Sequence, residues 1–464
     1  MHNWHETGYW KLDGQLVANP GGLGPDEKEF IYPGHRSNFL ILPYLLKELP
    51  GAAGGNGLLY DFTVLALTYG ALLWLLGTNL RGLLVAGIVC LSPGFMNNVA
   101  GVDTLGVPGL LGIAAMSFAA GCLSREGASP GLKYAALAVM AVYMLLNWSA
   151  LFSLGVAAVY LACKRRDWLK LAAFLAVPLA IGMAVLFVSM HSRHASVATS
   201  GNFWNIYLWG PAGYDGTGMN FGKAFARVTA VSLMAWSVLG VVALALVWLG
   251  GPGGNWRRAP WPLLAGIAAV FALRNYNAHH PWNCVCIVGL GLIFSIELLA
   301  GDRQQWGAFT KRAFVTGAAL FTVSYLSAWL MFDEFNQRGM TTVHALVFNY
   351  TPRHALLVVA DDLTPAGVND YKPVAEEFDR KVIPLNEWTR QSADFAAGGR
   401  EVYLLTHAVT PADPARLVAQ SHVRATWADR VMVPAFDFYR TKISRRPAAS
   451  RKAYFDDYQL YRLN

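Results

Sequence analysis

The chain has 464 residues, of which 55% are hydrophobic, 13% aromatic and only 14% charged. Soluble globular proteins carry about 25% charged residues, so this composition excludes an ordinary soluble domain. The net charge of +8 is carried by short segments between apolar runs, which indicates a polytopic membrane protein rather than a nucleic-acid-binding one.

The first fifty residues form a polar segment before the first long apolar run. An amphipathic run at 6–17 ends at the breaker Asn19-Pro20-Gly21-Gly22. A second run, at 37–49, follows Pro33-Gly34 and has Ser37 as its expected N-cap. We predict two short helices along a membrane surface, joined by a polar loop that carries acids and a His-Arg pair. The segment 1–56 is thus predicted to be one unit that precedes the first membrane span.

Ten apolar runs follow, at 58–78, 82–96, 105–123, 133–147, 148–163, 170–190, 226–249, 260–274, 282–300 and 313–331. Several are shorter than the ~20 residues that a straight membrane span needs. Short or broken helices are tolerated where protein or a water-filled cavity covers their free backbone groups. The sequence therefore predicts a transmembrane domain of about ten spans over 57–332.

Lysine and arginine gather in alternate loops between these runs. The basic loops hold Arg81; Arg125 and Lys133; Lys164, Arg165, Arg166 and Lys170; Arg257 and Arg258; and Arg303, Lys311 and Arg312. The positive-inside rule puts these loops in the cytoplasm, and the inverted topology is the alternative. The first fifty residues and everything after about residue 332 are then extracytoplasmic. We expect a further transmembrane helix upstream to carry the N-terminal loop across.

After residue 340 the composition changes to that of a small α/β domain, predicted to be extracytoplasmic over 340–464. The predicted strands are Ala355–Ala360, Val402–Leu405 and Tyr458–Leu463, and the predicted helical stretches between them are Val374–Lys381 and Asp413–Ser421. Alternating strands and helices indicate this fold class. Asp361-Asp362 follows a strand directly, where such a pair is more often a turn or cap than a site.

The stretch His5-Glu6-Thr7-Gly8-Tyr9, followed by the proline-containing segment Tyr32–Ser37, resembles the first external loop of the GT-C glycosyltransferases. The resemblance is to the branch that uses dolichyl- or undecaprenyl-phosphate sugars. Protein O-mannosyltransferases and the lipid A aminoarabinose transferase belong to that branch. Its loop opens with Asp-Glu and then Tyr. Here His5 stands at the first acid, so the resemblance implies Glu6 as the catalytic carboxylate and the segment 1–56 as the catalytic loop.

Two later stretches extend the resemblance over about residues 5–300. Ser92-Pro93-Gly94 and Val102-Asp103-Thr104 are similar to a second external loop that ends with an acid before the next helix. Asp103 is predicted to be catalytic, a helix N-cap, or both. The stretch 274–282 is similar to a basic and aromatic segment that faces the phosphate of the lipid-linked donor in that family. The alternatives for this stretch are an interfacial anchor and, less favoured, a metal site at its His pair.

Sugar transfer from a lipid phosphate needs a carboxylate for the acceptor hydroxyl and cations for the departing phosphate, all on one membrane face. The predicted catalytic residues are Glu6 and Asp103, with a solvated surface acid as the alternative for Glu6. The predicted residues for substrate or lipid-phosphate binding are His5, Tyr9, Asp13, His35, Arg36, Arg274, Tyr276, His279 and His280.

The resemblance thus implies an inverting, metal-independent glycosyltransferase of a bacterial inner membrane, with no cofactor and with its active site on the extracytoplasmic side. Its expected partners are the bilayer, a polyprenyl-phosphate sugar and a glycan, lipid or protein acceptor, but no nucleic acid. The alternatives are a transporter or flippase, a non-enzymatic envelope-assembly protein, and a polysaccharide polymerase or ligase.

Overall fold

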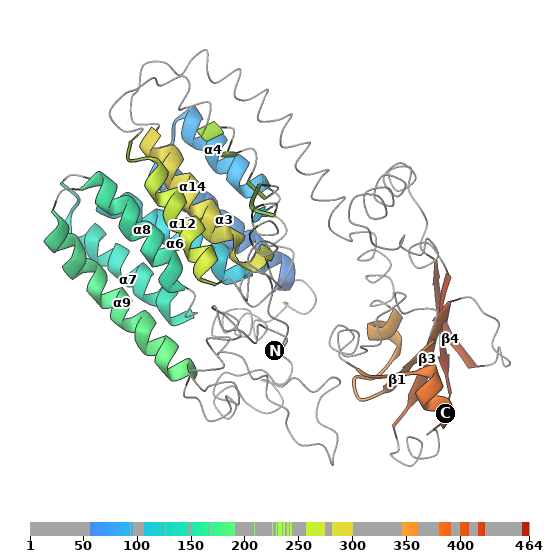
Figure 1. Cartoon of the computed structure of the whole chain (residues 1–464). Helices are drawn as coiled ribbons and strands as arrows, with labels where there is room; N and C mark the ends of the chain where they lie inside the picture. Colours follow the sequence, from blue (N-terminus) through green and yellow to red (C-terminus); the bar gives the residue numbers. More distant parts are fainter. Residues whose placement is uncertain are drawn as a thin grey trace. The chain divides into compact units, whose positions relative to one another are not determined.

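The structure is a computed structural model, in which the chain divides into a helical unit and a C-terminal sheet unit (Figure 1). The described residues are 56–92, 94–95, 106–125, 127–146, 150–165, 167–190, 208, 225, 229, 231–233, 235–236, 239–240, 242–243, 257–273, 281–299, 346–360, 380–390, 400–407, 416–422 and 457–463.

Eight helices of the helical unit are described. They are α3 (Asn56–Leu76), α4 (Leu80–Leu91), α6 (Gly106–Leu123), α7 (Pro130–Leu146), α8 (Ala150–Lys164), α9 (Trp168–Met190), α12 (Pro260–Ala272) and α14 (Pro281–Leu299). They confirm a helix in eight of the ten predicted apolar runs. The described residues within 226–249 are helical, and 313–331 lies outside the described residues.

Local chemistry explains where α3 ends and where α4 begins and ends. Gly77 follows α3 with φ of 92°, in the left-handed region that favours glycine. The side chain of Asn79 caps α4 by accepting a hydrogen bond of 3.0 Å from the backbone nitrogen of Gly82. The helix α4 ends at Leu91, before the end of the predicted run, because the hydroxyl of Ser92 donates to the backbone one turn earlier (2.7 Å) and a proline follows.

Among the described helices, α9 alone has an apolar stretch long enough to cross a bilayer, the 20 residues Leu169–Val188. The apolar segments found in the other helices of the described part are 10–17 residues long. Pro178 lies inside α9, and membrane helices tolerate such prolines. The number of membrane spans therefore stays a prediction.

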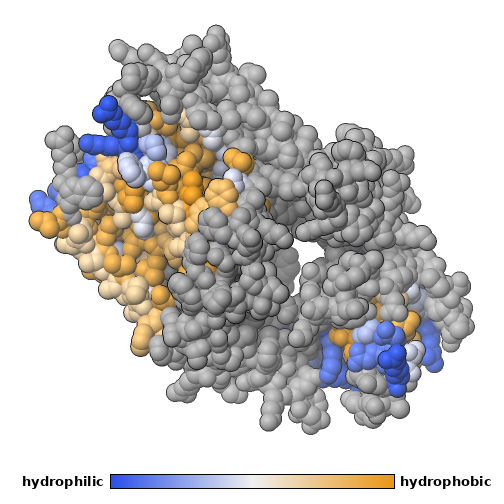
Figure 2. All heavy atoms as spheres, viewed as in Figure 1, coloured by the Kyte–Doolittle hydropathy of each residue, from blue (hydrophilic) through white to orange (hydrophobic). Residues whose placement is uncertain are grey.

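The described part of the helical unit exposes many apolar side chains. Figure 2 shows apolar residues gathered over the described part of this unit, with hydrophilic residues at one end of it. Large apolar side chains point outward on several helices, and Phe62, Leu169 and Phe187 are 66%, 88% and 63% exposed. Soluble monomers rarely expose apolar patches larger than a few hundred Å². Such a surface is compatible with a bundle embedded in lipid.

The helices α12 and α14 approach each other through reciprocal glycines. A methyl group added at Gly266 of α12 would lie 2.8 Å from the carbonyl oxygen of Ile287, and one added at Gly291 of α14 would lie 2.5 Å from that of Pro262. Small residues at such points let two backbones pack closely, which is the common device of membrane helix pairs. The glycines therefore fix the distance between α12 and α14.

The sheet unit contains a five-stranded mixed sheet in the order β2-β1-β3-β5-β4. Its strands are β1 (Leu356–Val359), β2 (Lys381–Pro384), β3 (Val402–His407), β4 (Leu417–His422) and β5 (Asp457–Arg462). The strand β1 is parallel to β2 and β3, whereas β5 is antiparallel to β3 and β4. All four residues of β1 are buried, as expected for a strand that lies between two parallel neighbours.

Three of these strands, β1, β3 and β5, confirm the predicted strands. The predicted helix Asp413–Ser421 is wrong where the structure describes it, because Leu417–His422 forms β4 and pairs with β5. The predicted helix Val374–Lys381 is also wrong at its described end, because Lys381 begins β2. Its residues 374–379 lie outside the described residues. Strand pairing with distant residues outweighs local helix preference at both places.

We predict that Gly291→Ala lowers the stability of the helical unit. The added methyl group overlaps the backbone of α12, and overpacking of this kind costs about 1–3 kcal/mol. Gly155→Ala on α8 is the control, because nothing lies within 4 Å of a methyl group there. Thermal unfolding of the full chain in neutral detergent measures both variants. Equal midpoints for Gly291→Ala and the wild type would contradict the close packing of α12 and α14.

A buried phenol gives the sheet unit a pH dependence. Burial, and then the hydrogen bond of 2.6 Å that its hydroxyl donates to Glu401, raises the pKa of Tyr403 to about 12. The folded state thus holds this proton more tightly than the unfolded chain, whose tyrosines titrate near pH ~10. The associated stability is complete below pH ~10 and is lost as the pH rises toward ~12.

We predict that Tyr403→Phe makes the stability of the sheet unit less dependent on pH between about 10 and 12. Protease protection of the C-terminal unit in increasing denaturant, at several pH values, measures this slope in the full chain. Tyr350→Phe is the control, because Tyr350 is 51% exposed. A slope that is the same in Tyr403→Phe and the wild type would show that the Tyr403 proton is not linked to folding.

Candidate functional site

The residues predicted to act in catalysis or binding all lie outside the described residues. This holds for the catalytic pair Glu6 and Asp103. It also holds for the binding set of His5, Tyr9, Asp13, His35, Arg36, Arg274, Tyr276, His279 and His280. The structure does describe the helices to which these segments are joined. The direction of each helix shows at which end of the bundle each segment begins or ends.

Polar contacts gather several helix ends at one side of the bundle. Lys164, the last residue of α8, forms an ion pair of 2.8 Å with Glu297 in the last turn of α14. Arg258, just before α12, donates a hydrogen bond of 3.1 Å to the carbonyl oxygen of Cys163. The carboxyl ends of α8 and α14 therefore lie beside the amino end of α12.

Two more arginines extend this side to α3 and α6. Arg125, just after α6, donates to the carbonyl oxygen of Trp74 in the last turn of α3 at 2.9 Å. Arg165, just after α8, donates to the carbonyl oxygen of Leu123, the last residue of α6, at 3.0 Å. We call the side of the bundle that carries Arg125, Lys164, Arg165 and Arg258 the basic end. The helices α3, α6, α8 and α14 all finish there.

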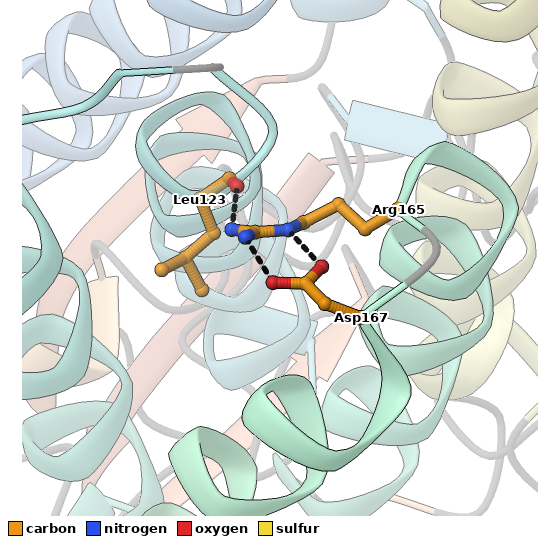
Figure 3. A network of polar contacts seen from close by, with 3 residues as sticks. All are labelled: Leu123, Arg165 and Asp167. Atoms are coloured by element: carbon orange, nitrogen blue, oxygen red, sulfur yellow. Dashed lines mark hydrogen bonds and ion pairs between the residues drawn. The ribbon is translucent and has the colours of Figure 1, made fainter.

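Arg165 also fixes the turn between α8 and α9, as Figure 3 shows. Its Nε and one terminal nitrogen donate to the two carboxylate oxygens of Asp167 at 2.8 and 2.5 Å. The Arg165 guanidinium holds the pKa of this carboxyl below its ordinary value. Asp167 lies directly before α9, where a negative charge is favoured by the helix dipole. Through Arg165, the start of α9 is therefore connected to the end of α6.

A second polar cluster joins α8 to α14. The hydroxyl of Tyr160 and the ammonium group of Lys164 each donate to a different oxygen of Glu297, both at 2.8 Å. The ring of Tyr160 also stacks on Phe294, with centroids 4.3 Å apart. Because both carboxylate oxygens already accept strong hydrogen bonds, the cluster acts as a joint between helices rather than as a proton acceptor for a substrate.

The predicted site segments join the helices at the end opposite the basic end. Asp103 precedes the start of α6, Arg274 directly follows the C-cap Leu273 of α12, and His280 directly precedes Pro281, where α14 begins. The N-terminal segment precedes the start of α3. Since α3, α6 and α14 begin at this end and α12 finishes there, the chain enters or leaves all four helices on one side.

A groove with a volume of about 710 Å³ runs between α3, α6 and α7. Its lining covers positions 66–74 of α3, 111–118 of α6 and 138–146 of α7, and small residues such as Gly70 and Ala115 create the space. Trp74 and Phe118 stack at the part of the lining nearest the basic end, with ring centroids 6.1 Å apart. The volume is within the usual range of ~300–1,000 Å³ for ligand sites.

The sequence analysis did not predict this groove. The available signal is a set of small residues on separate apolar helices: Ala66 and Gly70 four apart on α3, and the pair Ala114 and Ala115 on α6. Such residues are common in any membrane helix pair. They indicate an open groove only once the packing of α3, α6 and α7 against one another is known.

The sheet unit has one further candidate position, at the carboxyl ends of β1 and β3. These strands are parallel neighbours, and the chain leaves β1 toward β2 but leaves β3 toward the opposite side of the sheet. In open α/β sheets, ligands bind at such a switch point. Asp361 and Asp362 follow β1 directly in the sequence but lie outside the described residues.

Within the described ranges, no group of three or more His, Cys, Asp or Glu side chains is arranged to hold a metal ion. This result concerns those ranges alone. The expectation of a metal-independent reaction, and of no metal at His279 and His280, therefore stays a prediction.

No protein family matches the chain, and neither a curated protein nor a solved structure matches it. The resemblance to the GT-C glycosyltransferases rests on the sequence motifs alone.

We predict that the two ends of α7 face opposite sides of the membrane. Ser129→Cys precedes α7 at the basic end, and Ser149→Cys follows it. In a background without the five native cysteines, a membrane-impermeant maleimide should label Ser149→Cys in intact cells and Ser129→Cys only after permeabilisation. Labelling in the reverse order would invert the topology. Labelling of both in intact cells would show that α7 does not cross.

Proposed function

We propose that this protein is a membrane glycosyltransferase that moves a sugar from a polyprenyl-phosphate carrier to an acceptor at the extracytoplasmic face. The reaction class comes from the resemblance to the GT-C glycosyltransferases. On this proposal the bundle is embedded in the bacterial inner membrane with its basic end in the cytoplasm. The sheet unit is then an extracytoplasmic domain that contributes to acceptor binding.

The observation that carries the proposal is the direction of four helices. The loop with Glu6 precedes α3, Asp103 precedes α6, and the basic segment 274–280 connects α12 to α14. All three segments adjoin helix ends that are opposite the basic end. The predicted carboxylates and the predicted phosphate-binding cations therefore belong to segments that join the described helices on one side of the bundle, although up to hundreds of positions separate them in the sequence.

The proposed reaction uses these groups in complementary roles. Glu6 accepts the proton of the acceptor hydroxyl while its oxygen attacks the anomeric carbon of the sugar. The bond between that carbon and the carrier phosphate breaks, and polyprenyl phosphate leaves as an anion. Arg274 and the two histidines near it stabilise the charge that develops on the phosphate. Attack opposite the leaving group inverts the configuration of the sugar.

The distribution of charge within the helices supports this proposal over a transporter. A transporter or flippase favours charged groups at mid-depth in its spans. In the described helices, charged residues such as Lys133, Lys170 and Glu297 lie within the first or last two turns. This arrangement favours chemistry in the loops over a charged pathway through the described helices. An envelope-assembly protein, in contrast, predicts no requirement for Glu6.

We predict that Glu6→Gln lowers sugar transfer by a factor of about one hundred or more, because a lost general base costs ~10²–10⁴-fold. The measurement is transfer of radiolabelled sugar from a polyprenyl-phosphate donor in membranes that contain the full chain. Glu27→Gln is the matched control, since it removes a carboxylate from the same polar segment, at a position expected to be solvated.

Two results would contradict the proposal in different ways. Equal activity of Glu6→Gln and Glu27→Gln would remove Glu6 from the site but keep the reaction. An absence of transfer from every polyprenyl-phosphate donor, with the wild-type protein present in the membrane, would reject the enzyme and favour the transporter or the assembly protein.

A further inference from the structure

We propose that the groove between α3, α6 and α7 binds an anionic phospholipid of the bilayer, with an acyl chain in the groove and the phosphate at Arg125. The inference rests on the membrane location in the proposed function, but not on sugar transfer. The occupant is a membrane lipid at the basic end, not the sugar donor.

The lining of the groove fits an acyl chain. Alanine, glycine, leucine and valine residues form most of it. The lining positions from Ala66 to Trp74 extend for about 12 Å along α3. The groove is open along its side, where Leu67 and Val142 are 54% and 57% exposed. An apolar channel of this shape, open toward lipid, accepts a flexible hydrocarbon chain without any change in the helices.

Arg125 supplies the recognition of an anion at one end of the groove. Its guanidinium lies 3.8 Å from the centroid of the Trp74 ring, and the ring itself lines the groove. One nitrogen donates to the carbonyl oxygen of Trp74, and within the described part of the chain Arg125 forms no ion pair with a carboxylate. The side chain is exposed. A planar guanidinium held this way presents its other N–H groups to a phosphate.

The position of Arg125 decides between two lipids that share this chemistry. Polyprenyl phosphate and phospholipids both join an apolar chain to a phosphate. Arg125 lies at the basic end, whereas the segments predicted to bind the donor phosphate adjoin the opposite helix ends. Anionic lipids enrich the cytoplasmic leaflet, and basic pockets between helices on that side bind their headgroups. The groove therefore faces a phospholipid headgroup at its cytoplasmic opening.

A purely structural role for Arg125 makes a different prediction. Arg125 also binds a carbonyl oxygen at the end of α3, as basic residues near helix ends often do. If capping is its whole function, filling the groove elsewhere has no effect on lipid binding. Gly70 allows that separation, because a side chain added there meets nothing within 4 Å and enters the groove without touching Arg125.

The test is native mass spectrometry of the delipidated full chain in neutral detergent, titrated with dioleoyl-phosphatidylglycerol or dioleoyl-phosphatidylcholine. The wild type should bind one phosphatidylglycerol at least about tenfold more tightly than phosphatidylcholine, the effect expected of a hydrogen bond to a charged group. Arg125→Gln should abolish this preference, and Arg125→Lys should keep most of it. Gly70→Leu should weaken both lipids, whereas Gly155→Leu, outside the groove, should bind as the wild type does.

Three results would overturn the inference. One is equal binding of the two lipids by the wild type, and another is wild-type binding by both Gly70→Leu and Arg125→Gln. The third is displacement of phosphatidylglycerol by a lower concentration of undecaprenyl phosphate, which would assign the groove to the donor. Glu6→Gln should bind phosphatidylglycerol normally, so a failure of the transferase proposal is seen separately from a failure of the lipid site.

Discussion

The contacts between helix ends determine most of what can be inferred about this chain. Lys164 and Glu297 are 133 residues apart, and Cys163 and Arg258 are 95 apart, yet each pair joins the ends of two helices. Once these ends lie on one side, the side of every described helix end follows from the direction of its helix. On the proposed membrane location, moving any of these cations across the bilayer would be costly. The polarity of the bundle is therefore a strong constraint on the location of chemistry.

The sequence was sufficient for the helices because their information is local. A long apolar run predicts a buried or lipid-facing helix, and a polar side chain such as Asn79 marks its start. The strand β4 was not predictable in this way. Leu417–His422 has no clear alternation of apolar and polar residues, and its partner β5 begins at Asp457. A strand that depends on a partner some forty residues away is decided by pairing, which no local pattern expresses.

The candidate functional features also differ in whether their residues are close together in the sequence. Motifs such as 5–9 and 274–282 were found because charged and aromatic residues stand close together in sequence. The groove was missed because its residues are ordinary ones, alanine, glycine and leucine, spread over three helices. In the sequence, Arg125 served only to predict which loops are cytoplasmic. Its relation to Trp74, 51 positions earlier, appears only when α3 and α6 lie parallel with their ends together.

The two proposed phosphate-binding positions adjoin opposite ends of one bundle, so they would serve different physical purposes. The helix α6 spans Gly106–Leu123, about 27 Å at 1.5 Å per residue, with Asp103 before its start and Arg125 after its end. A headgroup bound at Arg125 would therefore be too far away to touch a donor phosphate at the opposite end of the bundle. On these two proposals it would influence transfer by holding α3 and α6 at a fixed depth, which sets where the loops at the other end meet the interface. The proposed lipid site would thus support the proposed reacting end, and mutations at Arg125 would act on the position of the loops rather than on the chemical step.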